Sequence, residues 1–360
     1  MTFTDTVESI TDALDAKKDL SMKDLTPILF GASAFQYLNA GCELGLFELL
    51  HTEGGLLKNE IAHHLHLKER ALNILLLGTT ALRLTMQEGN RYFNSTIISD
   101  LMDKGYWEIF KDIVAFEQYI VYKGQVDFAE SLKANSNVGL RHTPGNGRDL
   151  YYRLCENPEL ERIFYKYMTS WSKLSNPLLF KYINFSTIES IVDAGGGSGV
   201  NAIELARHSP TTRITLMEIP GTAKIAAENV TKANLSDQIT IVARNMFEED
   251  FPEGHQAILF SHQLGIWTEE ENVYLLTKAY NALQKNGCVL LFSSMSNDAG
   301  DGPLMAALDS VYFASIPSEG GMIYTWNEYE NWLKKAGFQK IKRYADPNSW
   351  TPHGIIEAIK

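Results

Sequence analysis

The stretch Val192-Asp193-Ala194-Gly195-Gly196-Gly197-Ser198-Gly199 decides the fold. It ends an apolar run that begins at Ile191, and a helical pattern from Val200 to His208 follows it. Glycines allow a tight turn between strand and helix and a close approach of backbone to a ligand. The spacing is G-x-G-x-G, whereas a dinucleotide fingerprint is G-x-G-x-x-G. Asp193, just before the turn, would repel a pyrophosphate and attract a ligand with an ammonium group.

Apolar runs and helical patterns alternate from this point onward. The further predicted strands are Ile214–Glu218, Ile239–Ala243, Ala257–Ser261 and Cys288–Ser293. Strands that alternate with helices indicate a parallel sheet covered on both faces. A chain of 360 residues also exceeds the length of about 150 residues that is usual for one domain. We therefore expect an α/β protein, with a mainly helical domain over residues 1–180 and a Rossmann-like domain over residues 181–360.

Polar and aromatic residues stand at the ends of the predicted strands. Glu218 ends the second strand, where a carboxylate can accept hydrogen bonds from vicinal ribose hydroxyls. Asn245-Met246-Phe247 follows the third strand, and its amide and side chains could contact the edge and faces of an adenine ring. Together with Asp193, Gly195 and Gly197, these residues predict a site for S-adenosylmethionine.

The first half of the chain is predicted to be helical. Helical patterns over Lys58–Leu65 and Lys68–Leu84 precede a hairpin signal at Glu88-Gly89-Asn90, which is the order of a winged helix. The chain carries 44 acidic and 32 basic residues, a net charge of −12, whereas nucleic-acid binding needs a basic face. We therefore predict that this region dimerises or covers the substrate, and that the protein binds neither nucleic acid nor an anionic membrane.

Composition also bounds the class of protein. The chain is 45% hydrophobic and 21% charged, values typical of a globular protein. Its three cysteines are widely spaced, which excludes a disulfide framework and a C-x-x-C zinc site. We find no signal peptide and no apolar run of the roughly 20 residues that span a bilayer. A cytoplasmic protein is expected.

Nearly the whole chain resembles the small-molecule O-methyltransferases of the plant caffeate and bacterial polyketide-tailoring type. The resemblance runs from Ala40-Gly41-Cys42-Glu43-Leu44-Gly45-Leu46-Phe47 to Gly354-Ile355-Ile356-Glu357-Ala358. It implies an N-terminal domain that forms a homodimer, a methyltransferase domain and a small aromatic substrate. The cofactor positions that it implies are Gly195, Gly197, Glu218, Met246 and Ser261. The family more often has Asp at the positions of Glu218 and Asn245, and both replacements keep a hydrogen-bond acceptor.

One segment departs from the family. Where the family has Lys-His-x-Leu-His-Asp-Trp, with the second His as general base, this chain has Ser261-His262-Gln263-Leu264-Gly265-Ile266-Trp267. Gly265 therefore stands at the position of the base. Ser293 and Ile323 stand where plant members have carboxylates that orient this His. A positioned base contributes about 10²–10⁴-fold to the removal of a phenolic proton, so ordinary O-methylation lacks its usual base in this chain.

Three explanations remain open. A ring carbon beside a hydroxyl or amino group can attack a methyl group through its π-system and lose its proton afterwards. The C-terminal half also resembles the C-methyltransferases of 3-hydroxyanthranilate, 3-hydroxykynurenine or tyrosine in antibiotic pathways, in the stretches Phe260–Leu264, Gly302–Asp309 and Trp350–Gly354. We therefore favour C-methylation. The alternatives are O-methylation with a substitute base, and a non-methylating use of the cofactor in pericyclic, decarboxylating or hydroxylating chemistry.

The catalytic candidates are His262, His353, Asp309, Tyr312 and Arg148. His262 follows the fourth strand, where it could contact the cofactor or act in catalysis. Asp309 and Tyr312 are three residues apart on a predicted helix and share a face that could hold an amino or hydroxyl group. Arg148 could pair with a substrate carboxylate. Against these stand the ordinary alternatives of a loop histidine, a core tyrosine and a surface arginine.

The sequence does not show whether His262 and His353 meet in space, where they could bind a metal, and we therefore predict no metal site. His63, His64 and His66 are close in sequence but have no acid or cysteine at ligand spacing, so a solvated helix end is expected. Tyr165, Met168 and Trp171 recur at helical spacing, which indicates either core packing or the wall of an aromatic pocket.

Overall fold

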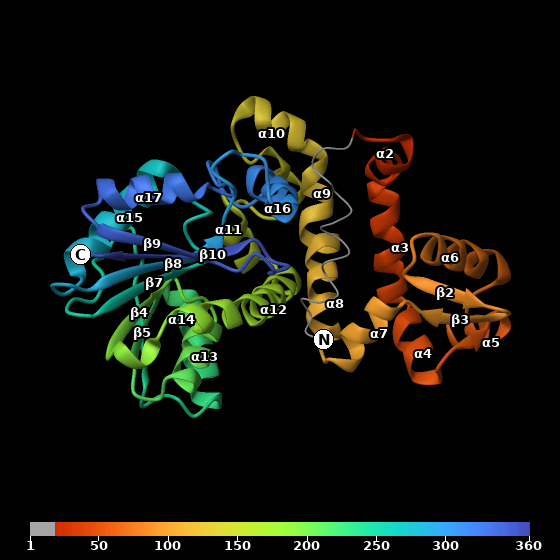
Figure 1. Ribbon diagram of the computed structural model, residues 1–360, viewed down its shortest axis with the longest axis horizontal. Coiled ribbons are helices and arrows are strands. Elements are labelled where there is room, and N and C mark those ends of the chain that lie inside the picture. Colours follow the sequence, from red (N-terminus) through yellow and green to blue (C-terminus); the bar gives the residue numbers. More distant parts are fainter. Residues whose placement is uncertain (1–18) are drawn as a thin grey trace. The chain divides into compact units, whose positions relative to one another are not determined.

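The computed structural model describes residues 19–360, which divide into two compact units (Figure 1). The first unit ends at Tyr119, and the second spans Ile120–Lys360. The sequence predicts a boundary between residues 180 and 181, where the alternation of strands and helices begins. The division lies earlier because the helical segment that precedes the sheet packs with the sheet, for example through contacts of α12 (Pro158–Tyr182) with α13 (Val200–His208).

The first unit combines helices with a small antiparallel sheet of order β1-β3-β2. In the hairpin, Glu88 pairs with Arg91 and Gly89 has φ 59°. Helices α5 and α6 precede this hairpin, so the order predicted for a winged helix is confirmed. The elements are α2 (Met22–Leu29), α3 (Gly31–Glu43), α4 (Leu46–Glu53), β1 (Leu56–Leu57), α5 (Lys58–His64), α6 (Glu69–Ala81), β2 (Thr85–Glu88), β3 (Arg91–Asn94), α7 (Thr96–Asp103) and α8 (Trp107–Phe116).

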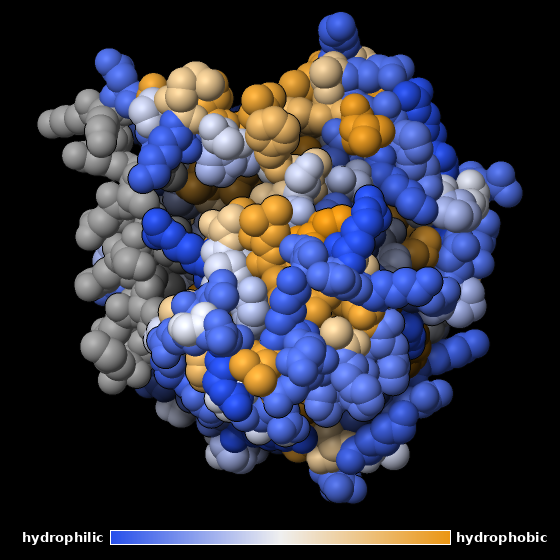
Figure 2. All heavy atoms as spheres, turned by 90° about the vertical axis from the view of Figure 1, so that its right-hand side faces the viewer, coloured by the Kyte–Doolittle hydropathy of each residue, from blue (hydrophilic) through white to orange (hydrophobic). Residues whose placement is uncertain are grey.

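The core of this unit is formed by apolar side chains at helical spacing. Leu46 and Leu50 of α4 pack with Leu72 and Leu76 of α6, and all four are buried. In contrast, α2 has no buried residue. Figure 2 shows apolar residues exposed among hydrophilic ones on this side of the molecule. The exposed large apolar residues on α2, beside it and on α6 include Leu20, Met22, Leu25, Ile28, Leu29, Phe30, Ile74 and Leu77.

The second unit opens with short helices and one long helix. They are η1 (Glu117–Val121, which begins in the first unit), α9 (Tyr122–Gly124), η2 (Gln125–Asp127), α10 (Phe128–Ala134), η3 (Val138–His142), α11 (Leu150–Cys155), α12 and η4 (Phe185–Thr187). Helix α11 starts where the Asp149 side chain accepts a hydrogen bond from the Tyr152 amide, and α12 starts with Pro158 in its first turn.

A seven-stranded sheet of order β6-β5-β4-β7-β8-β10-β9 is the centre of this unit. Its strands are β4 (Ser190–Ala194), β5 (Arg213–Glu218), β6 (Ile239–Ala243), β7 (Ala257–Ser261), β8 (Cys288–Ser294), β9 (Gln339–Ala345) and β10 (His353–Ile359). The strands β4 to β8 are parallel, as the sequence predicts. The strand β10, which lies beyond the predicted strand series, runs antiparallel to both of its neighbours, so the whole sheet is mixed. A short connection joins β9 to β10, and such a connection can only reverse the chain direction.

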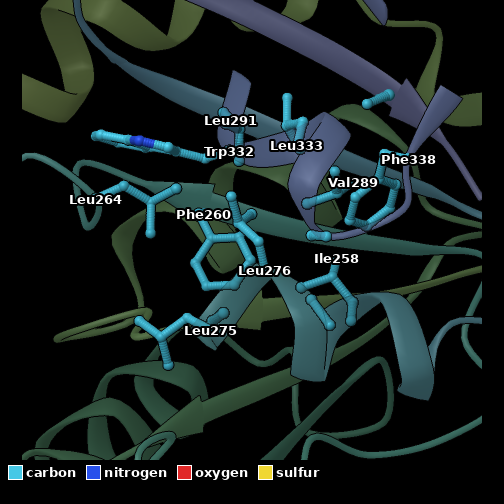
Figure 3. Close-up of a cluster of buried hydrophobic side chains, with 14 of the residues drawn as sticks. Ile258, Phe260, Leu264, Leu275, Leu276, Val289, Leu291, Trp332, Leu333 and Phe338 are labelled. Carbon is cyan, nitrogen blue, oxygen red and sulfur yellow. The ribbon is translucent and has the colours of Figure 1, made fainter. Parts of the chain in front are cut away.

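Helices cover both faces of this sheet. On one face, α12, α13 and α14 (Pro220–Lys232) pack on β4, β5 and β7 through one hydrophobic cluster. On the other face, α15 (Glu269–Ala282) and α17 (Trp326–Lys335) pack on β7 and β8, and Figure 3 shows Leu276, Trp332 and Phe338 in this second cluster. The remaining helix, α16 (Leu304–Ser315), follows β8. Within residues 19–360, every helix is too short or too polar to cross a lipid bilayer.

The second cluster provides a test of the packing. Leu276 is fully buried on α15, so Leu276→Ala should lower the free energy of unfolding by about 2–5 kcal/mol, measured by chemical denaturation. Leu132 on α10 is 61% exposed, and Leu132→Ala should change this free energy by less than about 0.5 kcal/mol. Equal effects of the two substitutions would contradict the packing described here.

Candidate active site

A cavity of about 540 Å³ lies at the carboxyl ends of the parallel strands, within the unit that spans Ile120–Lys360. The ends of β4, β5, β7 and β8 form one side of it. Further residues come from α11, α12 and α16 and from the loops that follow the strands. Ligands of open α/β sheets bind at this edge, beside the strand where the order reverses, which here is β4.

The glycine turn after β4 requires glycine for two different reasons. Gly195, Gly197 and Gly199 all have positive φ, at 68°, 56° and 87°. At Gly195, an added Cβ would also lie 2.6 Å from the side chain of Gln263. Gln263 Nε2 donates a hydrogen bond of 2.8 Å to the Gly195 carbonyl, so the loop after β7 is tied to the turn after β4. Gly195 and Gly197 both line the cavity.

Asp193 lies behind the turn rather than on the cavity wall. Its carboxylate is so close that a Cβ on Gly196 would lie 2.6 Å from Oδ2. Among the described residues, no side chain donates a hydrogen bond to either carboxylate oxygen, and both are buried. Burial, with Glu218 nearby, raises the pKa of Asp193 to about 7. A cation held at the turn would stabilise the ionised form of this carboxyl group.

Glu218 ends β5 and lines the cavity, with its carboxylate fixed by backbone amides. The amide of Gly197 donates 2.9 Å to Oε2, and the amide of Ile219 donates 2.8 Å to Oε1. Burial raises the pKa of this carboxyl group, and the two amides oppose that shift. Each oxygen keeps a lone pair that can accept a further hydrogen bond, which fits a vicinal diol.

Asn245, Met246 and Phe247 also line the cavity. The amide oxygen of Asn245 accepts a hydrogen bond of 3.0 Å from the Phe247 backbone, which orients the side chain, while its Nδ2 group and a second oxygen lone pair stay available for the edge of a ring. Phe247 meets Trp267 edge to face, with 4.9 Å between the ring centroids. Lys278 donates to the Met246 carbonyl and holds this loop in place.

Ser261 and His262 stand at the end of β7. The Ser261 hydroxyl accepts a hydrogen bond of 2.7 Å from Asn201, the second residue of α13, and both line the cavity. His262 lines it as well, and its Nδ1 lies 3.3 Å from Nε2 of His353. His353 is buried behind it and does not line the cavity. The sequence alone does not show whether these two histidines meet, and the structure places them in contact.

Gly265 has no side chain, although its backbone does not demand glycine. Its φ is not positive, and an added Cβ would meet Met322 O at 3.5 Å and Phe313 Cε1 at 3.6 Å, which are ordinary contacts. The backbone here could therefore accept a Cβ without strain, and that atom would lie beside the Phe313 ring. Ser293 lines the cavity and Ile323 is buried, so neither of these positions supplies a carboxylate.

Aromatic side chains form the wall opposite the strands. Asp309 and Tyr312 of α16 share one face and line the cavity, as their spacing predicts. Burial raises the pKa of Tyr312 well above its usual range, and the neighbouring Tyr151 and Asp309 add to this shift. The other members of this wall are Tyr151, Phe164, Tyr165, Tyr167, Met168, Trp171 and Phe313.

Arg148 lies on the cavity and is exposed, on a loop that is pinned to the end of α16. Asn137 Nδ2 donates to the carbonyls of Arg148 and Ile316, and the Leu150 amide donates 2.8 Å to the Pro317 carbonyl. The backbone that carries this guanidinium group is therefore fixed.

The part of the chain that the structure describes contains no group of three or more His, Cys, Asp or Glu residues placed to hold a metal ion. His63, His64 and His66 lie at the end of α5 and just beyond it, in the first unit.

Several residues of the cavity were not predicted from the sequence. Gln263 and Asn201 adjoin predicted motifs, so their position alone could have indicated them. Tyr151 and Phe313 carry no such signal, because they come from helices that precede and follow the strands along the chain and only the fold brings them to the strand ends.

Comparison with known proteins places the chain in a family. It matches the O-methyltransferase domain over residues 127–339 and the O-methyltransferase dimerisation domain over residues 26–104. It is 53% identical over 346 residues to the L-tyrosine C(3)-methyltransferase of Streptomyces lavendulae, covering 96% of this chain and 94% of the relative. It is 29% identical over 338 residues to the 3-hydroxy-5-methyl-1-naphthoate 3-O-methyltransferase of Streptomyces sahachiroi, covering 93% and 94%.

A solved structure agrees with these matches. The S-adenosylmethionine-dependent methyltransferase SibL, in its apo form, superposes with a TM-score of 0.84 at 44% identity and covers 94% of this chain and 99% of its own. The predicted fold class, the predicted cofactor and the predicted enzyme class are thereby confirmed. The chain belongs to the O-methyltransferase family, with its dimerisation domain, and is an S-adenosylmethionine-dependent methyltransferase.

Proposed function

We propose that this enzyme methylates a ring carbon next to the hydroxyl group of a para-hydroxyphenyl amino acid, of which L-tyrosine is the simplest. The observation that carries the proposal is Gly265, which leaves the position of the family's base without an imidazole although the backbone there would accept a Cβ. The relative that is 53% identical is named as an L-tyrosine C(3)-methyltransferase, which supports the same acceptor.

Carbon methylation removes the need for a base at this position. A phenol that attacks the methyl group with its oxygen must lose its proton as the new bond forms. A ring carbon attacks with π electrons instead, and its hydrogen leaves only after the new bond exists. Phe313, which borders the space at Gly265, then offers an apolar surface to the acceptor ring.

The cofactor would lie along the strand ends, and when bound it supplies an electrophilic methyl group. Asp193 would attract its ammonium group, Gly195 and Gly197 would allow its close approach, and Glu218 would accept from its ribose hydroxyls. The residues proposed for the adenine and the remaining contacts are Asn245, Met246, Phe247, Ser261 and His262. The buried, unpaired carboxylate of Asp193 fits a positively charged ligand.

The amino-acid group of the acceptor would be held by two charged side chains on the cavity wall. Arg148 would pair with the carboxylate from its pinned loop, and Asp309 would pair with the ammonium group. Tyr312, on the same face of α16 as Asp309, would add a hydroxyl group. The aromatic wall formed by α11, α12 and α16 would enclose the ring.

We further propose that the enzyme is a homodimer held by its first unit. The matched dimerisation domain covers this unit, and its exposed apolar residues include Ile28 and Leu29 of α2 and Leu77 of α6. Apolar side chains that gather on an exposed helix surface are typical of interfaces.

The site of methylation can be measured directly. Purified enzyme, S-adenosylmethionine with an isotopically labelled methyl group, and L-tyrosine should give a product whose label is bonded to the ring carbon beside the hydroxyl, as shown by NMR. A label bonded to oxygen would mean that the enzyme is an O-methyltransferase with a substitute base and would refute the proposal.

The contacts proposed for Arg148 and Asp309 can be tested separately by the choice of acceptor. Arg148→Gln should raise KM for L-tyrosine by about tenfold or more with little change in kcat, because a binding contact shared by ground and transition state is lost. Tyramine has no carboxylate, so the same variant should not raise its KM. Asp309→Asn should raise KM for L-tyrosine but not for 3-(4-hydroxyphenyl)propionate, which lacks the ammonium group. An equal loss with all acceptors would contradict these assignments.

The titration of Asp193 predicts a pH dependence of cofactor binding. The pKa of Asp193 is about 7 in the free protein. A ligand whose ammonium group favours the ionised carboxylate must therefore displace a proton from Asp193 at lower pH. Calorimetry should show that S-adenosylhomocysteine binds about tenfold more weakly at about pH 5.5 than at about pH 7.5. Asp193→Asn should bind weakly with no such dependence. The same pH dependence in the variant would rule out Asp193 as its origin.

A further inference from the structure

We propose that His262 accepts the hydroxyl proton of the acceptor at its Nε2, and that His353 is a positioning residue that holds the opposite ring nitrogen. This inference rests on the proposed function, because it supplies the proton acceptor that Gly265 does not provide. Two buried histidines would then replace one histidine that the family places elsewhere.

The geometry of the pair carries the inference. His262 Nδ1 and His353 Nε2 are 3.3 Å apart, and the two rings meet edge to face with 4.9 Å between centroids. His262 Nε2, the far nitrogen of that ring, is buried and has no hydrogen-bond partner among residues 19–360. The same residue lines the cavity. A buried polar atom without a partner is costly, so one that borders a cavity indicates a ligand group.

The contact between His262 and His353 joins two segments that are far apart in the sequence. His262 follows β7, and its backbone is held at φ 57° with its amide donating 2.8 Å to the Phe292 carbonyl. Such a conformation is uncommon for a residue other than glycine and concentrates at functional sites. His353 begins β10, whose reversed direction brings its first residue to the edge where the parallel strands end. Trp171 and Phe292 pack against the His353 ring and fix it.

The protonation states follow from burial. Burial lowers the pKa of His262 to about 4 and that of His353 well below its usual range, so both rings are neutral at neutral pH. A neutral imidazole has one N–H group. When the His262 Nδ1–H donates to His353 Nε2, the His262 Nε2 is left as an acceptor that faces the acceptor's hydroxyl. His353 also stabilises the imidazolium that forms there.

The ring carbon beside the hydroxyl forms a bond to the methyl group, the carbon–sulfur bond breaks with its electron pair on sulfur, and the positive charge passes to the ring and its hydroxyl. This hydroxyl proton moves to His262 Nε2 and leaves a neutral dienone. The ring hydrogen then leaves to water as a proton, the oxygen takes back the proton from His262, and one proton is released in all.

The low basicity of His262 suits this task. A hydroxyl group on a cationic ring is far more acidic than a phenol, so a weak base is sufficient once the methyl group has been transferred. Before that transfer, a neutral ring adds no second positive charge beside the sulfonium group of the methyl donor.

Four variants test the pair. His262→Asn, in which asparagine tolerates the positive φ, should lower kcat for L-tyrosine by about 10²–10⁴-fold. His353→Phe keeps a ring but has no acceptor and should lower kcat by about tenfold or more. In His353→Gln the amide oxygen can accept from His262 Nδ1–H, so kcat should recover most of that loss. His208→Asn removes a histidine outside the cavity and should leave kcat within about twofold.

The substituent on the acceptor separates a proton acceptor from a structural role. A tyrosine fluorinated on one side of the hydroxyl has a more acidic phenol, so the ratio of wild-type to His262→Asn rates should shrink by about tenfold with it. Loss of a merely structural side chain would lower both rates by the same factor. A His262→Asn variant within about threefold of wild type, or a ratio that does not change on fluorination, would overturn the inference.

These outcomes are distinguishable from failure of the proposed function. If wild-type product carries its methyl group on oxygen, C-methylation is refuted, while a large and fluorine-sensitive deficit of His262→Asn would still support His262 as the proton acceptor. If the product is C-methylated and the deficit is absent, only the histidine pair is refuted.

Discussion

The hydrogen bond between Gln263 and the Gly195 carbonyl connects the two strand ends on which the active site depends. Gly195 leaves room for this contact, since an added Cβ would lie 2.6 Å from the Gln263 amide and force it to shift. The contact sets the distance between the turn after β4, where the cofactor is proposed to lie, and the loop after β7, which carries His262 and Gly265. A single close approach of backbone and side chain therefore positions both the donor side and the acceptor side of the cavity.

The chemistry of the acceptor depends on the side chains in and beside the loop after β7. The family positions a histidine one residue after Leu264, and this chain has glycine there, facing Phe313. Because the backbone at Gly265 could carry a side chain, the absence of the imidazole belongs to the reaction rather than to the fold. His262, three residues before Gly265 in the sequence, and His353 at the start of β10 form a buried pair that provides two neutral rings instead.

The sequence was sufficient for the parts of the site that depend on local patterns. Asp193, Gly195, Glu218 and Ser261 could be placed together because parallel strands end at one edge of a sheet. The reversed direction of β10 could not be derived from its own residues, so the meeting of His353 with His262 stayed open. The hydrogen bond from the Phe247 amide to the Asn245 side-chain oxygen depends on a local turn, which was not predicted from the sequence. Tyr151 and Phe313 were missed because their contribution depends on helix packing, which hydrophobic spacing does not determine.

The central claim is that the methyl group is transferred to a ring carbon. The most direct measurement uses L-tyrosine deuterated at both ring carbons beside the hydroxyl, and compares the deuterium released into water with the S-adenosylhomocysteine formed. Ring methylation predicts one deuteron released for each S-adenosylhomocysteine. Formation of S-adenosylhomocysteine without release of deuterium would contradict the claim.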